Sequence, residues 1–327
     1  VVIEVGAVVV CKFYGYEEYD DNYKIKTVIY QDGTMIVNER PSDSENNILK
    51  HGSVVKTIDA LTEDNPYIFT SDLTTRPWNN EILDLVTVEI GSYIQPTYMR
   101  YWFYQATNLT TVDFTKADFS TNVSWSYSFV KCSNLSELKQ GLPLVTSSCT
   151  SLYNTFYECE NLTSLDVGNW NVSNITTMRG TFAYCSKITN LDVDSWNTGK
   201  VTSLQNLFYG CTKLSNIDMS NWDVSKVENM NSTFRSCTSL TQLNLSSWDT
   251  SLVTTTAHMF RASTNLTTII VGSLFDVSSA TSSYMFLDCT SLVGGAGTVY
   301  SSANVDNTYA RIDNPPNSPG YFTGSNN

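Results

Sequence analysis

Cysteine, histidine and carboxylate side chains are the residues of this sequence that could carry chemistry. The chain has eight cysteines and two histidines, but it has no C-x-x-C pair of the kind that binds zinc. His51 and His258 lie far apart, and neither belongs to a Ser-His-Asp or Cys-His arrangement. No glycine-rich phosphate loop is present. We therefore expect no catalytic residues, no metal and no cofactor, and a protein that is not an enzyme.

A repeat of 26 residues accounts for most of the cysteines. Eight of the 14 phenylalanines mark it, with one extra residue between the second and the third: Phe103, Phe129, Phe156, Phe182, Phe208, Phe234, Phe260 and Phe286. A Cys follows three residues later in six copies: Cys132, Cys159, Cys185, Cys211, Cys237 and Cys289. A Trp follows fourteen residues later in four copies: Trp170, Trp196, Trp222 and Trp248. The consensus is F-x-x-C-x-x-L-x-x-L-D-V-x-x-W.

The apolar spacing within the repeat predicts its shape. L-x-x-L-x-V changes its period from three to two, which predicts a short strand. Val172, Ile175 and Met178 are spaced by three, which favours a 3₁₀ or short helical turn, or a tight arc. Each unit is too small to bury its own apolar residues, so the units must stack. We predict a β-rich solenoid, a leucine-rich-repeat-like right-handed coil stack with a small N-terminal β domain.

Three segments are expected along the chain. Residues 77–292 form the repeats, and 293–327 the C-terminal cap and tail. Residues 1–76 read as an N-terminal β-rich domain for assembly, anchoring or capping, with a hairpin around Asp32 and a first strand at the start of the chain. A faint first copy places three apolar residues at the offsets expected from Pro77: Leu83, Val86 and Val88.

The repeated positions also predict which side chains are structural. We expect a buried ladder of Phe156, Phe182, Phe208 and Phe234, of Cys159, Cys185, Cys211 and Cys237, and of Trp170, Trp196, Trp222 and Trp248. Six cysteines at one repeat position favour buried thiols over disulfides. The Trp stripe is interpreted as core, although a partly exposed edge could stack on a sugar or protein partner.

Polar residues that alternate with the core positions predict an exposed surface. We expect a ligand-facing stripe along the strands: Thr163, Asp166, Thr189, Asp192, Ser215, Asp218, Thr241 and Asn244. Asp166, Asp192 and Asp218 would lie about 4.8 Å apart in a stacked sheet. They could bind a cation, or they could be solvated and bonded to nearby hydroxyls and backbone. We favour the second interpretation because no known calcium-binding loop is present.

The charge of the chain limits its partners. The net charge is −13, the pI is about 4.5, and no Lys/Arg run exists, so we expect no nucleic acid as partner and no anionic membrane surface. No stretch reaches about 20 apolar residues, so no membrane insertion is expected. A surface rich in Ser, Thr and Asn is common in secreted and virion proteins.

The consensus F-x-x-C-x-x-L-x-x-L-D-V-x-x-W-x-V-S-x-V-x-x-M resembles the BspA-type leucine-rich repeat, over about two thirds of the chain. That family occurs in surface proteins of host-associated bacteria, in some protists and in phage-encoded proteins. The resemblance implies adhesion outside the cell or at its surface, to a protein or glycan on another surface, with no catalytic residues to carry over. Copies of the chain could also associate through the N-terminal domain. The alternative is a structural subunit of a phage fibre, virion decoration or extracellular filament.

Overall fold

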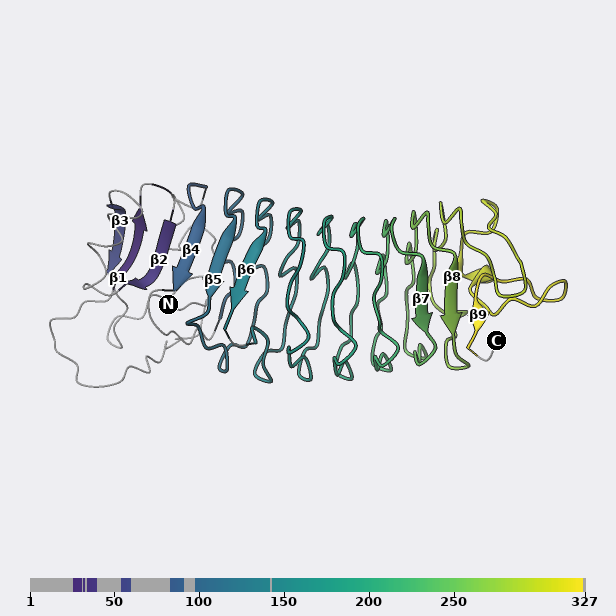
Figure 1. Cartoon of the computed structure of the whole chain (residues 1–327). Helices are drawn as coiled ribbons and strands as arrows, with labels where there is room; N and C mark the ends of the chain where they lie inside the picture. The colour runs from purple at the N-terminus through teal and green to yellow at the C-terminus, as the bar shows by residue number, and fades with distance from the viewer. Residues whose placement is uncertain are drawn as a thin grey trace.

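The computed structural model describes residues 26–30, 32, 34–39, 54–59, 83–90, 98–141 and 143–325. In these residues the chain winds into coils that stack along one axis, so the molecule is elongated (Figure 1). The predicted β-solenoid is confirmed. Each ladder phenylalanine lies at the centre of one coil, and every one of them is fully buried.

Short parallel strands form one side of the array. β4 (Thr87–Ile90), β5 (Thr111–Phe114) and β6 (Glu137–Gln140) pair in parallel near its beginning. At its end, β8 (Thr268–Val271) pairs in parallel with both β7 (Gln242–Leu245) and β9 (Thr323–Gly324).

The most regular coils, between β6 and β7, alternate buried and exposed residues as a strand does. They lack the regular hydrogen bonds that join neighbouring strands. Leu165 and Val167 are buried and Asp166 is exposed, yet none of the three is in a regular strand. Strands expected in these coils from L-x-x-L-x-V are therefore absent. The alternation needs only an extended backbone over a core, whereas a strand also needs regular hydrogen bonds to both neighbours.

The sheet of the array extends into the N-terminal part of the chain. β1 (Lys26–Tyr30) and β2 (Thr34–Glu39) form the predicted hairpin around Asp32, and β3 (Val54–Asp59) pairs antiparallel with β1. β2 pairs in parallel with β4, which gives a six-stranded sheet in the order β3-β1-β2-β4-β5-β6 (Figure 1). The strand expected at the start of the chain lies outside the described residues, and a domain boundary at residue 76 stays a prediction.

The register predicted for the faint first copy is wrong. Val88 pairs with Val112, so Leu85 and Val88 point into the core and are fully buried. Leu83 and Val86 are 53% and 37% exposed. This copy is shorter than 26 residues, so counting from Pro77 shifts Leu83 and Val86 onto the wrong face.

Aromatic rings stack from coil to coil inside the solenoid. The rings of Phe156 and Phe182 have centroids 5.9 Å apart and are parallel within 1°. The rings of Trp196 and Trp222 have centroids 5.9 Å apart. The Trp222 indole N–H donates to the Val193 carbonyl of the preceding coil at 2.9 Å. The four ladder tryptophans are therefore core residues whose only polar atom finds a hydrogen-bond partner inside the array, as burial requires.

The return side of each coil is built from consecutive turns. No helix occurs in the described residues of the repeats, and the apolar triplet closes a turn in which the Ile175 N–H donates to the Val172 carbonyl at 2.9 Å. A single 3₁₀-type turn and a tight arc both have such an i→i−3 bond, so both of these expected alternatives agree with the structure. The helix that the structure does describe is η3 (Asn307–Tyr309), a single 3₁₀ turn near the C-terminus.

Left-handed backbone recurs two residues before and two residues after each ladder phenylalanine. Asn154 and Glu158, with φ of 51° and 60°, flank Phe156 in this way. Such a conformation costs a non-glycine residue about 1 kcal/mol. In return, alternate N–H groups point at the next coil: those of Asn154 and Glu158 donate at 2.8 Å to the carbonyls of Arg179 and Ala183. Hydrogen bonds between coils thus offset the local strain.

The segment after the last repeat covers the end of the solenoid and is fixed by Asp313. This carboxylate is 6% exposed and accepts hydrogen bonds from the N–H groups of Ala296, Thr298 and Gly320 and from the Thr298 hydroxyl. Burial opposes ionisation, but these hydrogen bonds outweigh it and lower the pKa of Asp313. The Asp313 carboxylate therefore holds separate segments of the cap together through hydrogen bonds.

Candidate functional site

All eight residues predicted for the ligand-facing stripe on the strand side are exposed. Thr163, Asp166, Thr189, Asp192, Ser215, Asp218, Thr241 and Asn244 all lie on the solvent side of the array. The residues that alternate with them, such as Leu191 and Val193, are buried. We call these eight residues the polar stripe. The structure brings them to one face, and their role in binding stays a prediction.

The aspartates of the polar stripe have two different environments. The Ser220 N–H and hydroxyl donate to Asp218 at 2.9 and 2.7 Å, and they lower the pKa of this carboxyl. Asp192 shares a hydrogen bond with Asp194, and this bond, together with the charges of Asp194 and Asp166, raises its pKa. Within the described part of the chain, no group of three His, Cys, Asp or Glu side chains is arranged to hold a metal ion. The stripe is thus an acidic and hydroxyl-rich surface.

The cysteine ladder is a hydrogen-bonded row of thiols. The Cys185 and Cys211 thiols each donate at 3.1 Å to the carbonyl of the ladder phenylalanine in the preceding coil. Ser263 replaces Cys in one coil and makes the same bond at 2.7 Å. All described cysteines are free and buried, and burial raises the pKa of Cys211 to about 12. These thiols thus connect neighbouring coils by hydrogen bonds. Because their pKa values are raised, they are poor nucleophiles.

A second surface, which was not predicted from the sequence, lies on the side of the turns. We call it the turn face: the residues from six before to two after each ladder phenylalanine. Arginines lie over tyrosine rings along it. The guanidinium carbon of Arg179 is 5.3 Å from the centroid of the Tyr153 ring, and that of Arg235 is 4.8 Å from the Tyr209 ring. Tyr184 and Tyr209 have ring centroids 4.5 Å apart.

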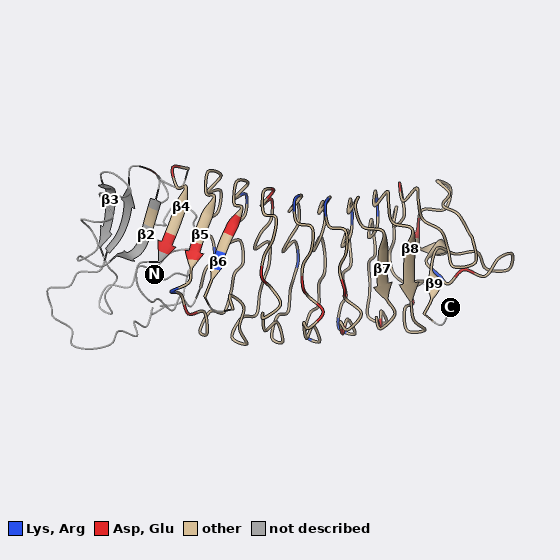
Figure 2. Cartoon of the chain, in the orientation of Figure 1, with Lys and Arg blue, Asp and Glu red and all other residues tan. Residues whose placement is uncertain are grey.

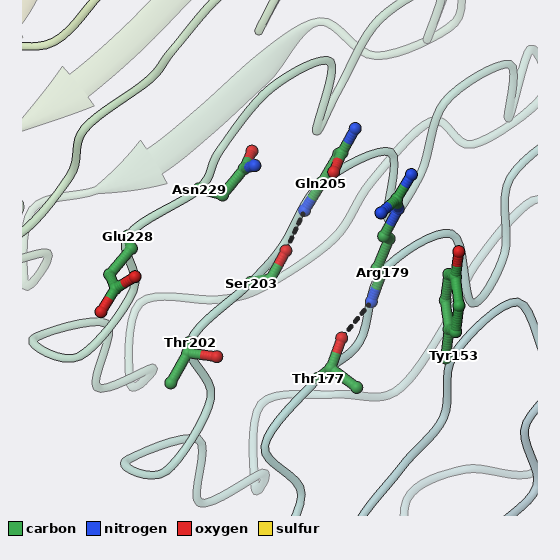
Figure 3. A pocket seen from close by; sticks show the side chains of 8 residues that line it. All are labelled: Tyr153, Thr177, Arg179, Thr202, Ser203, Gln205, Glu228 and Asn229. Atoms are coloured by element: carbon green, nitrogen blue, oxygen red, sulfur yellow. Dashed lines mark hydrogen bonds between the residues drawn. The ribbon is translucent and has the colours of Figure 1, made fainter.

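The turn face contains an open pocket of about 340 Å³ (Figure 3). Every residue that lines it carries a polar side-chain group: Tyr153, Thr177, Arg179, Thr202, Ser203, Gln205, Glu228 and Asn229. The backbone N–H of Arg179 donates to the Thr177 hydroxyl at 3.3 Å, and that of Gln205 donates to the Ser203 hydroxyl at the same distance. Equivalent turns thus place Arg179 and Gln205 side by side in successive coils.

The signal for this face was present in the sequence. The column three residues before the ladder phenylalanine contains Tyr153, Arg179 and Gln205, and the column one residue after it contains Tyr209 and Arg235. Successive turns bring these columns to one face. Helix and strand periodicities do not describe such turns, so they could not show that the columns share a face. The expected exclusion of nucleic acid rested on the lack of a Lys/Arg run. The fold nevertheless collects arginines from separate repeats, so that exclusion stays a prediction.

His258 is the histidine that the structure describes, and it also lies on the turn face. Its ring stacks on Tyr284 with centroids 5.8 Å apart. Burial and the charges of Arg235 and Arg261 lower its pKa, so it is neutral at pH 7. In the sequence, His51 lies in the N-terminal part, outside the described residues. The positive charge near Tyr284 thus comes from Arg235 and Arg261 and not from His258.

The fold and the two exposed faces define a β-solenoid protein built from leucine-rich-type coils. Three overlapping segments, residues 97–190, 123–238 and 176–298, match the family described as "Mycoplasma protein of unknown function, DUF285". Together they span more than half of the sequence, so the chain belongs to this family. No curated protein matches the sequence.

Two solved structures are similar to parts of the chain. A leucine-rich repeat protein from Eubacterium ventriosum is 14% identical over 86% of this chain and 99% of its own, with a TM-score of 0.30. The structure of a TLR13–ssRNA13 complex matches with 18% identity and a TM-score of 0.29. That match covers 64% of this chain and 32% of the TLR13 chain. Likenesses this distant add nothing to the description of either face.

The described residues contain no candidate membrane-spanning helix. None of the helices found there combines the length and the apolar character that a membrane crossing requires. Figure 2 shows short, scattered charged segments along a mostly tan array, because Ser, Thr, Asn and apolar residues make up most of each coil.

Proposed function

We propose that the chain is a non-enzymatic binding and adhesion protein that acts outside a cell and contacts its partner through the polar stripe. The observation that carries this proposal is the separation of roles within each coil. The Phe, Cys and Trp ladders hold the fold from inside, while the residues of the polar stripe are exposed and repeat at the same place in successive coils. Solenoids commonly use such a repeated surface to bind extended partners.

Three further features support an extracellular role. The repeat resembles the BspA type, whose members are surface proteins that adhere to host proteins or other cells. The exposed residues are mainly hydroxyls and amides, which suits a secreted protein. Burial raises the pKa of Cys159, Cys185 and Cys237, so these thiols resist oxidation in an oxidising environment. The partner we expect is a protein or glycan on another surface.

Charge insertion into the polar stripe tests the proposal. The double variant Thr189→Arg/Ser215→Arg places two bulky cations in the middle of the stripe. Asn221→Arg is the control, because Asn221 is exposed in the same part of the array but lies outside the stripe. Binding would be measured to immobilised extracellular matrix proteins, to a panel of neutral glycans and to host cells stripped of acidic glycans. We expect the double variant to lose about tenfold or more in affinity, since the introduced charges would be desolvated without partners.

The control variant should bind like the wild type, and all three proteins should unfold at similar temperatures. If the double variant keeps full binding to every surface that the wild type recognises, the polar stripe is not the contact face. If the wild type recognises none of them, the adhesion proposal itself fails.

The alternative of a structural subunit has one observation in its favour. β3 (Val54–Asp59) is the outermost strand of the six-stranded sheet, and it pairs only with β1 among the strands that the structure describes. An edge strand offers backbone hydrogen bonds to another copy. Size-exclusion chromatography with light scattering tests this alternative. A strict monomer across a wide concentration range, with residues 1–76 present, would contradict it.

A further inference from the structure

The arginines of the turn face have unused binding capacity. Arg179, Arg235 and Arg261 each lie over a tyrosine ring, at 5.3, 4.8 and 5.9 Å from its centroid. Within the described part of the chain, none of the three guanidinium groups makes a hydrogen bond or an ion pair. A guanidinium presents several N–H donors in a planar fork that matches a carboxylate. The stacked arginines are therefore oriented by their tyrosines and still available to an anion.

Arg179 is the arginine of these three that lines the turn-face pocket. Figure 3 shows Arg179 and Tyr153 at one end of it and Glu228 at the other, with Gln205, Ser203 and Asn229 between or beside them. The backbone beneath is held on both sides, because Asn154 and Gly180 donate to the carbonyls of Arg179 and Gln205 at 2.8 and 2.9 Å. The pocket is thus a preformed feature of several stacked coils.

The chemistry of the lining specifies a ligand that is rich in hydroxyl groups and has one anionic group. Ligand pockets for small molecules are usually lined mainly by apolar residues, whereas every residue that lines this one carries a polar side-chain group. Hydroxyls and amides can donate to and accept from sugar hydroxyls, and Glu228 can accept from them. Glu228 would also repel a second anionic group at its end of the pocket.

We infer that the turn-face pocket binds a carboxylate-bearing sugar of the uronic or sialic acid class, with the carboxylate on Arg179 and the hydroxyls on Ser203, Gln205 and Asn229. The sugar would be a terminal or side-chain residue of a larger glycan, because the pocket is open on the surface. This site is separate from the polar stripe, so it does not depend on the proposed function of that stripe.

Two other classes of ligand fit the same face less well. Single-stranded nucleic acid needs open aromatic faces for its bases, but here arginines cover one face of Tyr153 and Tyr209. A phosphate backbone is also opposed by Glu228 and by the net charge of −13. An extended peptide needs free backbone groups for pairing, and the backbone of the turn face is engaged between coils.

The test is a titration of the full chain with 3′-sialyllactose and sodium glucuronate, with lactose as the neutral control, followed by calorimetry and saturation-transfer NMR. We expect the two acidic sugars to bind and lactose not to. Arg179→Gln should weaken binding about tenfold or more, since it removes the charge-assisted fork. Arg179→Lys should restore it only in part, because an ammonium group lacks the fork. Arg261→Gln, on the same face but outside the pocket, is the matched control and should bind normally.

Several results would overturn the inference. One is the absence of binding of either acidic sugar at millimolar concentration, and another is equal binding by the wild type and Arg179→Gln at an unchanged unfolding temperature. Equal or tighter binding of an oligouridylate or an acidic peptide in competition would replace the sugar by that class of ligand. The stripe variant Thr189→Arg/Ser215→Arg should still bind the sugars, so a failure of the adhesion proposal would leave this result unchanged.

Discussion

Replacement of Cys185 separates two explanations of the cysteine ladder. If the thiol only fills space, Ala should be tolerated better than Ser, because a buried hydroxyl without a partner costs about 1–3 kcal/mol. In the structure, the Cys185 thiol donates at 3.1 Å to the Phe156 carbonyl. Ser can keep that bond, as Ser263 does with Phe234 at 2.7 Å.

The size of the effect follows from what each variant removes. Cys185→Ala deletes one buried heavy atom, which costs about 1 kcal/mol by analogy with the loss of a methyl group, and a hydrogen bond of about 0.5–1 kcal/mol. Cys185→Ser keeps the bond and loses mainly apolar contact, so we expect a cost of about 1 kcal/mol. Ser should therefore be as stable as Ala or more stable, although it is the more polar residue.

Urea unfolding followed by tryptophan fluorescence measures this order, since the tryptophan ladder is buried throughout the same coils. Ser263→Ala is the complementary variant. It removes the Ser263 bond to the Phe234 carbonyl and the Cys237 N–H bond to the Ser263 hydroxyl at 3.2 Å, which leaves that N–H with the Phe234 carbonyl at 3.3 Å. We expect it to cost about 1–3 kcal/mol. A Cys185→Ser protein that is less stable than Cys185→Ala by 1 kcal/mol or more would refute the hydrogen-bonding role.

Three further predictions concern the backbone, the cap and the tryptophans. Ser236 has a φ of 58°, so Ser236→Gly should raise the free energy of unfolding by about 0.5 kcal/mol, while Ser239→Gly, without a positive φ, should lower it; urea unfolding distinguishes the two. Because the folded pKa of Asp313 is lowered, its carboxylate stabilises the cap above the unfolded pKa of about 3.9, and this stability is lost as the pH falls through the lower folded pKa. Asp313→Asn should abolish that acid-sensitive step in thermal melts between pH 2 and 5; an unchanged step would assign it to other groups. Trp222→Phe removes the indole bond to the Val193 carbonyl, which keeps the Trp196 N–H at 3.2 Å, and part of the buried ring, so it should cost about 1–3 kcal/mol; a cost near zero would show that neither contributes.

The sequence alone determined the architecture of the array. The spacing of the ladder residues predicts one coil per repeat, because an apolar side chain can be buried only against its equivalent in the next coil. It also placed the polar stripe on the outside, since Asp166 and Asp192 alternate with core positions. Where the repeat is irregular, as at Leu83 and Val86, the register failed, because a short copy breaks the count.

Only the tertiary structure decided what the turns do. Left-handed residues such as Asn154 and Glu158 are set by hydrogen bonds to the next coil and have no single residue type as a signature. Those turns bring Tyr153, Arg179 and Gln205 to one surface, although they come from different repeats. The thiol bonds of the cysteine ladder were hidden for the same reason, since their acceptors lie in the preceding coil. Spacing fixes which side chains are inside, whereas contacts between coils fix how the remaining ones combine into sites.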